Sequence, residues 1–175
     1  RRKLQWARNC IAIGLSSGFL EPLESTSIHL IQSAVLRLVQ CFPGVDNIDA
    51  VRQEFNRQSQ AEFEAIRDFI ILHYHLNQRE DKGLWQYCRQ MVLPDSLKQR
   101  IELFKQSALV FRQQDELFTE VAWQQVMLGQ GLIPTAYNKM ADNLTDKQLS
   151  SFLNDLKHII THTTQQLPAH QAFLR

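Results

Sequence analysis

A long stretch without glycine or proline, residues 45–82, is the feature that most restricts the fold of this chain. Glycine and proline are the residues that most readily interrupt a helix, so a helix that starts here can continue. Apolar residues from Ile48 to Leu72 recur every three or four positions, which is the spacing of one helix face. The stretch therefore predicts one long helix or two in succession, with a solvated turn or a kink at the polar residues Arg57 to Gln60.

The rest of the chain also shows helical spacing, with capping residues where helices begin. Phe42-Pro43-Gly44 and Gly129-Gln130-Gly131 are typical helix ends. One short apolar run, Cys10 to Ile13, predicts a buried strand that Gly14 ends. With about seven helices and this strand, the predicted fold class is mainly α. The further predicted helices cover residues 25–41, 84–91, 94–104, 116–128 and a long final segment capped by Thr145.

Composition limits the classes of partner. The chain has 19 Lys and Arg against 18 Asp and Glu, whereas nucleic acids and anionic membranes attract strongly basic proteins. No apolar run approaches the roughly 20 residues that span a bilayer. Cys10, Cys41 and Cys88 form no C-x-x-C pair, which favours reduced thiols in a cytoplasmic protein over a disulfide framework or a metal site. The sequence predicts a cytoplasmic protein with no nucleic-acid, membrane or metal partner.

The predicted strand, the glycine-containing loop after it and the helix start at Ser25 to Ser27 together form a candidate anion site. The first N–H groups of a helix have no partner within the helix and carry the positive end of its dipole, so they can hold a phosphate, a carboxylate or a halide. Glu24 lies beside this helix start and has two interpretations. It either compensates the helix dipole or performs chemistry next to the bound anion.

The residues from Asn9 to Leu30 closely resemble the signature of flavin-dependent tryptophan halogenases, and G-F-L-E-P-L-E-S-T is its most specific part. The resemblance covers essentially this whole chain but only the C-terminal part of that family's proteins. It implies that residues 1–44 are the edge of a flavin-binding module and residues 45–175 a multi-helical substrate-binding module. The strand would then belong to a flavin-binding α/β domain outside this chain. Further matches are Ile66 to Ile70 with His73-Tyr74, Leu84-Trp85 with Tyr87-Cys88, Ala122-Trp123 with Gly129 to Gly131 and Pro134, and Pro168-x-His170.

The resemblance implies a halogenating enzyme that uses reduced FAD, O2 and chloride or bromide to modify an aromatic, tryptophan- or indole-like substrate. Glu24 falls on the family's catalytic glutamate, which orients the halogenating species and helps to remove the ring proton. Thr26 and Ser27 fall where backbone amides hold the halide. The implied partners are a separate flavin reductase and an N-terminal flavin domain of the same protein, with room for a homodimer. The residues implied to line the flavin ring are Ser16, Ser17, Gly18, Phe19 and Leu20.

The substrate side of the resemblance is mixed. Tryptophan-specific members carry two adjacent aromatic residues, a glutamate for the ammonium group and a Phe-Trp pair around the indole. The equivalent positions here are His73, Tyr74, Glu80, Leu84 and Trp85. Tyr74, Glu80 and Trp85 match the pattern, whereas His73 and Leu84 depart from it. Glu80 also has a charged residue on either side, which suits a solvated loop equally well. The substrate therefore stays open between tryptophan, free indole, another aromatic and a carrier-bound acyl group.

Several parts of the halogenase machinery are absent from these residues. The sequence contains neither G-x-G-x-x-G nor W-x-W-x-I-P, and none of its lysines lies in a motif that matches the family's catalytic lysine. The chain alone is therefore predicted to be inactive. Two alternatives remain at this point. One is a related flavin monooxygenase that does not use halide, and the other is a helical interaction module that retains the motif for packing.

Overall fold

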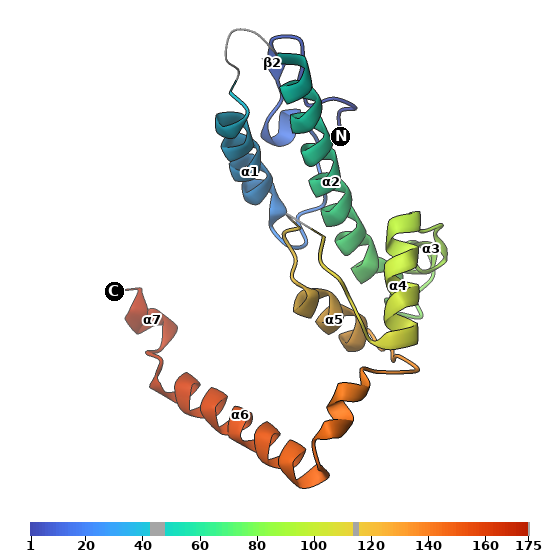
Figure 1. The fold of residues 1–175 in the computed structure, drawn as a ribbon, viewed down its shortest axis with the longest axis vertical. Helices are drawn as coiled ribbons and strands as arrows, with labels where there is room; N and C mark the ends of the chain where they lie inside the picture. Colours follow the sequence, from blue (N-terminus) through green and yellow to red (C-terminus); the bar gives the residue numbers. More distant parts are fainter. Residues whose placement is uncertain (43–47, 114–115, 175) are drawn as a thin grey trace. The chain divides into compact units, whose positions relative to one another are not determined.

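The computed structural model describes all of residues 1–175 except 43–47, 114–115 and 175 (Figure 1). The chain divides into two compact units, Arg1–Tyr137 and Asn138–Arg175. The described residues are mainly α-helical with one two-stranded sheet, as the sequence predicts. In chain order the elements are β1 Trp6–Ala7, β2 Cys10–Ile11, the 3-10 helix η1 Gly14–Ser16, α1 Thr26–Gln40, α2 Ile48–His75, α3 Leu84–Gln90, α4 Asp95–Ser107, α5 Glu120–Gly129, the 3-10 helix η2 Lys139–Asn143, α6 Asp146–Gln166 and α7 His170–Phe173.

Helix α2 is the central element of the first unit and is one continuous helix of 28 residues (Figure 1). At 1.5 Å per residue it is about 42 Å long. The turn or kink expected at Arg57 to Gln60 is not formed, and one residue of this polar segment packs against a polar side chain of α1 instead of facing solvent. Ser59 is only 1% exposed, and its Oγ accepts a hydrogen bond of 2.8 Å from Arg37 on α1.

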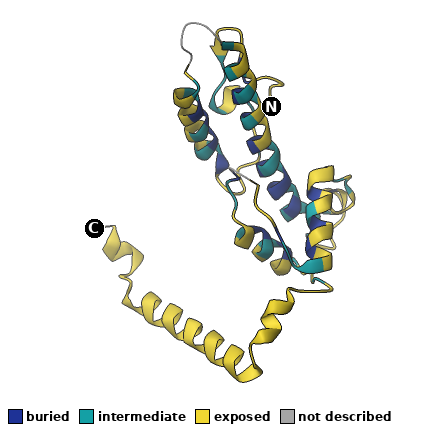
Figure 2. Cartoon of the chain, in the orientation of Figure 1, coloured by how far each residue is buried: buried dark blue, intermediate teal, exposed yellow. Residues whose placement is uncertain are grey.

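Two apolar clusters pack along α2, whose buried residues lie between Phe55 and Leu72 (Figure 2). Phe69 centres the larger cluster, where its ring stacks on Phe118 with centroids 3.8 Å apart and meets the edge of Trp123 at 4.8 Å. The second cluster joins Leu30 of α1 to α2. The periodic apolar residues of 48–72 are therefore the core, as the helical spacing predicts. The buried members are Phe69, Leu72, Leu97, Ile101, Phe104, Val110, Trp123 and Met127 in the first cluster, and Leu30, Phe63, Ile66 and Ile70 in the second.

The N-terminal strand differs from the prediction in both pairing and burial. β2 is not a lone buried strand, because it pairs antiparallel with β1 through Trp6↔Ile11 and Ala7↔Cys10, and Cys10 is exposed. A tight turn makes this possible, with Arg8 in the left-handed region at φ 55°. Trp6 anchors the hairpin on α2, where its ring meets Phe55 edge-on at 5.5 Å. Whether the hairpin also belongs to a flavin-binding domain stays a prediction.

Most helix starts agree with the capping residues in the sequence. α4 begins directly after Pro94, and Thr145 caps α6 in a reciprocal capping box with Gln148. The predicted helix at 116–128 begins late, at Glu120, because Thr119 accepts the hydrogen bond that closes the first turn. Boundaries move by a few residues wherever two possible caps follow each other.

The second unit, described by itself, consists of η2, α6 and α7. All of its described residues are exposed in this chain (Figure 2). α6 nevertheless carries an apolar stripe of Leu149, Phe152, Leu153, Leu156, Ile159 and Ile160, each 42–60% exposed. No helix among the described residues has the length and apolar character needed to cross a membrane. The predicted functional division at residue 44 lies inside the first compact unit and remains a prediction.

Candidate active site

The loop before α1 places Glu24 outside the helix. Ser25 sits at the N-cap position in the left-handed region, at φ 54°, and its N–H donates to the Pro22 carbonyl oxygen at 3.0 Å. The first turn of α1 contains no acidic residue, so Glu24 is not a residue of that turn. Its carboxylate Oε1 lies 3.4 Å from Nε2 of His73 on α2, and the side chain remains 38% exposed. The loop thus directs Glu24 toward α2.

The start of α1 has no side-chain cap. Ser25 makes no capping hydrogen bond despite its residue type, and the first turn of α1 contains no acidic residue that could balance the helix dipole. Thr26 is 1% exposed, and its Oγ1 is buried without a hydrogen-bond partner among the described residues. A buried unpartnered hydroxyl beside uncapped N–H groups is a suitable environment for a small anion. The donor set at Thr26 and Ser27 therefore fits a halide.

A buried polar network fixes α1 against α2. Arg37 donates to Glu62 Oε2 at 3.0 Å and to Gln58 Oε1 at 3.0 Å, in addition to Ser59. His29 Nε2 lies 2.9 Å from the other carboxylate oxygen of Glu62. His29 is therefore hydrogen-bonded within the structure. Because both helices are held here, the start of α1 has a defined position relative to His73.

An aromatic cavity of about 320 Å³ lies next to this contact. The Tyr74 and Trp85 rings stack with centroids 5.9 Å apart and planes 17° apart. Asn77 links the backbone segments that carry the two rings, because its amide nitrogen donates to the Tyr74 and Trp85 carbonyl oxygens at 2.6 and 3.2 Å. The Arg79 guanidinium lies 4.7 Å from the Trp85 ring centroid. The cavity is lined by Leu23, His73, Tyr74, Asn77, Gln78, Arg79, Trp85 and Gln130.

Three of the five predicted substrate residues meet at this cavity, namely His73, Tyr74 and Trp85. His73 also reaches Glu24, so the predicted catalytic and substrate residues are adjacent. Glu80 and Leu84 do not line the cavity, and Leu84 is 62% exposed. Five further residues line the cavity but were not among the predicted substrate residues, namely Leu23, Asn77, Gln78, Arg79 and Gln130. Two of them had a signal in the sequence, since Leu23 lies in the G-F-L-E-P-L-E-S-T motif and Gln130 in the Gly129-Gln130-Gly131 match.

Gly131, the last residue of the Gly129-Gln130-Gly131 match, follows Gln130 at the cavity wall, and its position favours glycine. The Gln78 amide nitrogen donates to the Gln130 carbonyl oxygen at 2.7 Å. A Cβ atom on residue 131 would stand 2.1 Å from this nitrogen, and the backbone there is left-handed at φ 85°. Only glycine satisfies both conditions. Gly131 thus keeps the two sides of the cavity together.

Tyr74 should remain a neutral hydrogen-bond donor in this site. Partial burial, followed by the hydrogen bond and the negative charge of Glu21, raises the pKa of Tyr74 above its ordinary value of 10.0. The folded protein therefore holds the phenolic proton more tightly than the unfolded chain. This contribution to stability is complete below about pH 10 and is lost as the pH rises through the higher folded value.

The ultraviolet absorbance of tyrosinate, as the difference between the wild type and Tyr74→Phe, measures this titration. We expect the Tyr74 transition above pH 10, and a transition at lower pH in Glu21→Gln because the carboxylate is removed. A Tyr74 transition at or below pH 10 in the wild type would contradict the assignment.

The predicted flavin residues divide into two groups. Ser17 is 3% exposed, and its hydroxyl donates to the Gly14 carbonyl oxygen, so it shapes the loop. Gly18 packs against Arg1, since a Cβ there would come within 2.7 Å of the Arg1 side chain. Ser16 and Phe19 are exposed, and the Phe19 side chain is 65% exposed. A planar cofactor could therefore contact Ser16 and Phe19 on the surface of a loop that Ser17 and Gly18 hold in shape.

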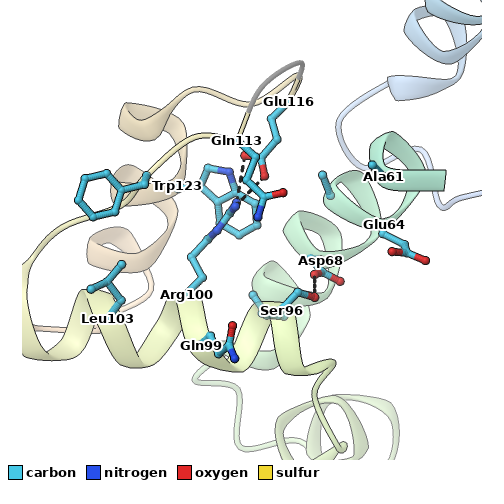
Figure 3. Close-up of a pocket in the computed structure, with 13 residues that line it drawn as sticks. Ala61, Glu64, Asp68, Ser96, Gln99, Arg100, Leu103, Gln113, Glu116 and Trp123 are labelled. Carbon is cyan, nitrogen blue, oxygen red and sulfur yellow. Dashed lines mark hydrogen bonds and ion pairs between the residues drawn. The ribbon is translucent and has the colours of Figure 1, made fainter. Parts of the chain in front are cut away.

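A second cavity, of about 360 Å³, borders a different part of α2 (Figure 3). Figure 3 shows Arg100 reaching from α4 toward Glu116, with hydrogen bonds of 2.6 and 3.2 Å, while Ser96 faces Asp68. The guanidinium of Arg100 also lies 4.1 Å from the Trp123 ring centroid. None of the candidate site residues lines this cavity. Arg100 and Glu116 pair with each other, and Glu64 and Asp68 pair with Arg1 and Arg67 outside the cavity, which indicates a structural role.

Metal chemistry finds no support in the part of the chain that the structure describes, where no group of three His, Cys, Asp or Glu side chains is placed to hold an ion. The two histidines at helical spacing on α6, His158 and His162, have ring centroids 6.3 Å apart with no third ligand type beside them.

Comparison with known proteins agrees with this geometry. The sequence profile of a family described as tryptophan halogenase matches residues 1–146, so the chain belongs to the tryptophan halogenase family. Over 105 residues it is 41% identical to tryptophan 6-halogenase SttH of Streptomyces toxytricini and 34% identical to tryptophan 7-halogenase RebH of Lentzea aerocolonigenes. Each alignment covers 60% of this chain and 20% of the relative.

Solved structures extend the similarity to the second unit. Xcc4156, a flavin-dependent halogenase from Xanthomonas campestris, is 49% identical with a TM-score of 0.96 over 100% of this chain. BrvH, a flavin-dependent halogenase from Brevundimonas sp. BAL3, is 41% identical with a TM-score of 0.94 over 99% of this chain. The chain spans only 35% of each of those two proteins.

Proposed function

We propose that this chain is the C-terminal part of a flavin-dependent halogenase that chlorinates or brominates an aromatic, tryptophan- or indole-like substrate. The observation that carries the proposal is the contact between Glu24 and His73 at the edge of the aromatic cavity. It joins the most specific motif of the sequence to a site that can hold a ring. Membership of the halogenase family supports the same reaction.

The cavity residues would bind and orient the substrate. Tyr74 and Trp85 offer aromatic surface, and offset stacking on such rings favours a flat, electron-rich substrate. A ring held in one orientation presents one carbon to the halogenating species, which lowers the entropic barrier to reaction. Glu24, on the open side, would orient that species and accept the proton that the ring carbon loses. Arg79 beside Trp85 would contact polar groups of the substrate.

The first turn of α1 would hold the halide through its backbone N–H groups at Thr26 and Ser27, with the buried Thr26 hydroxyl beside them. Ser16 to Leu20 would lie along the flavin ring, with Phe19 as the exposed apolar contact. When bound, reduced FAD would supply electrons to O2, and the oxygen activated in this way would oxidise the halide. This chain's own part is to position the anion, the carboxylate and the substrate.

The other proposed partners are inferred from the exposed apolar side chains of this chain and from the greater length of its relatives. α1 exposes one apolar side and α6 another, and the relatives are about three times as long as this chain. We propose that an N-terminal flavin domain of the same protein covers these surfaces, and that a separate flavin reductase supplies reduced FAD. A homodimer is compatible with the remaining surface. Three free cysteines favour the cytoplasm. The exposed apolar residues on α1 are Ile28, Ile31, Val35, Leu36 and Val39.

An assay of the full-length protein with reduced FAD, O2 and a panel of indoles and tryptophan tests the proposal. We expect products in which one chlorine or bromine replaces one ring hydrogen, detected by mass spectrometry only when the halide is present. Hydroxylated products that form without halide would instead identify a monooxygenase. Absence of any turnover together with stable binding of another protein would favour the interaction module.

A further inference from the structure

We infer that His73 is a positioning residue that holds the Glu24 carboxylate through a proton on its Nε2 atom. The inference rests on the proposed function, because it assigns His73 a task in the reaction of that site. Glu24 comes from the loop before α1 and His73 from α2, and the two side chains meet with Oε1 and Nε2 3.4 Å apart. The His73 side chain is 18% exposed, so the contact is largely shielded from solvent.

The other ring nitrogen of His73 determines where the protons are. Nδ1 lies 2.8 Å from the backbone carbonyl oxygen of Phe69, one helical turn earlier. A carbonyl oxygen only accepts hydrogen bonds, so Nδ1 must carry a proton. Phe69 also meets the His73 ring edge-on at a centroid distance of 4.8 Å, which restricts rotation of the imidazole. The ring therefore presents Nε2, and only Nε2, to Glu24.

With Nδ1 already protonated, the state of Nε2 decides whether the contact with Glu24 attracts or repels. An unprotonated Nε2 would place its lone pair against the lone pairs of the carboxylate. A protonated Nε2 points its N–H toward Oε1 and forms an ion pair with the carboxylate at the observed 3.4 Å. The ion pair engages Oε1 and leaves Oε2 available for the ring proton of the substrate. His73 thus orients Glu24 without itself receiving that proton.

The test compares His73→Gln and His73→Leu in the full-length protein. Gln can still donate a hydrogen bond to Glu24, whereas Leu cannot. We expect His73→Leu to lower kcat for halogenation by about 10²-fold, because a misplaced catalytic group commonly loses that much. His73→Gln should recover most of the loss, because its side-chain amide can still donate to the Glu24 carboxylate. His75→Gln is the matched control, since His75 bonds the Cys88 carbonyl oxygen outside the cavity, and it should behave as the wild type.

Equal losses in His73→Gln and His73→Leu would overturn the inference. A separate readout does not require halogenation. The 15N chemical shifts of the His73 ring should show that its neutral form keeps the proton on Nδ1, whereas a neutral form protonated at Nε2 would refute the proton assignment. Failure of the wild type to halogenate any substrate, with the expected nitrogen shifts, would refute the proposed function and leave the Nδ1 assignment standing.

Discussion

Replacing Glu24 with Gln is expected to lower aromatic halogenation by about 10²–10⁴-fold, which is the range that a positioned general acid or base contributes. Gln keeps the size of the side chain but cannot accept the ring proton as a carboxylate does. The halide site proposed at the start of α1 would use backbone N–H groups, which this substitution does not alter. Oxidation of halide to hypohalous acid should therefore continue while the halogenated product nearly disappears.

The measurement pairs product formation, by mass spectrometry, with trapping of hypohalous acid by a chlorination-sensitive dye. Glu21→Gln is the matched control, because it makes the same change of charge three residues earlier, where the carboxylate partners Tyr74 instead of His73. We expect the control to lose less than about tenfold, because the reacting carboxylate remains. Full activity in Glu24→Gln would remove Glu24 from the mechanism.

Replacing Glu62 with Leu is expected to destabilise the packing of α1 on α2 by about 3–5 kcal/mol, because it leaves the buried Arg37 without its charged partner. The Glu62 side chain is 7% exposed and the Arg37 side chain 9% exposed, so water cannot replace the lost contact easily. His29 loses the same partner. Since this network sets the position of Glu24 relative to His73, halogenation should fall together with stability.

Thermal unfolding and hydrogen exchange of the α1 backbone amides provide the measurement. The double variant Arg37→Met/Glu62→Leu should regain much of the loss, because an apolar pair of similar volume leaves no buried unpaired charge. Glu54→Gln is the control on the same helix, where an exposed pair with Arg57 should leave the unfolding midpoint nearly unchanged. A midpoint for Glu62→Leu as high as that of Glu54→Gln would show that the network does not hold the two helices together.

The parts of the fold that the sequence predicted correctly depend on local patterns. The helical spacing of 48–72 is the core face of α2, and Thr145 caps α6, because each signal lies within a few residues of the element it specifies. The predictions that were wrong depend on contacts outside the predicted segment. The polar residues Arg57 to Gln60 suggested a solvated turn or a kink, but Ser59 packs against Arg37, 22 positions away on α1. The run from Cys10 suggested a buried strand, but Cys10 is exposed and pairs with Ala7 in a hairpin.

The candidate site shows the same division. The motif around Glu24 indicated the halogenase family and the approximate residues of the site. It could not indicate that Glu24 points to His73, or that Arg79 instead of Glu80 lines the aromatic cavity. Neighbouring loop residues differ in side-chain direction. That direction follows from contacts with other elements of the fold, such as the stacking of Arg79 on Trp85 of α3.

The sequence by itself determined a mainly helical protein of the halogenase type with a carboxylate just before a helix start. Helix periodicity and a motif of consecutive residues are local, so both can be read without a fold. Only the tertiary structure decided what that carboxylate faces and which side chains form the cavity. Those relations depend on how α1 packs on α2, and the buried Arg37–Glu62 pair fixes that packing between residues 25 positions apart.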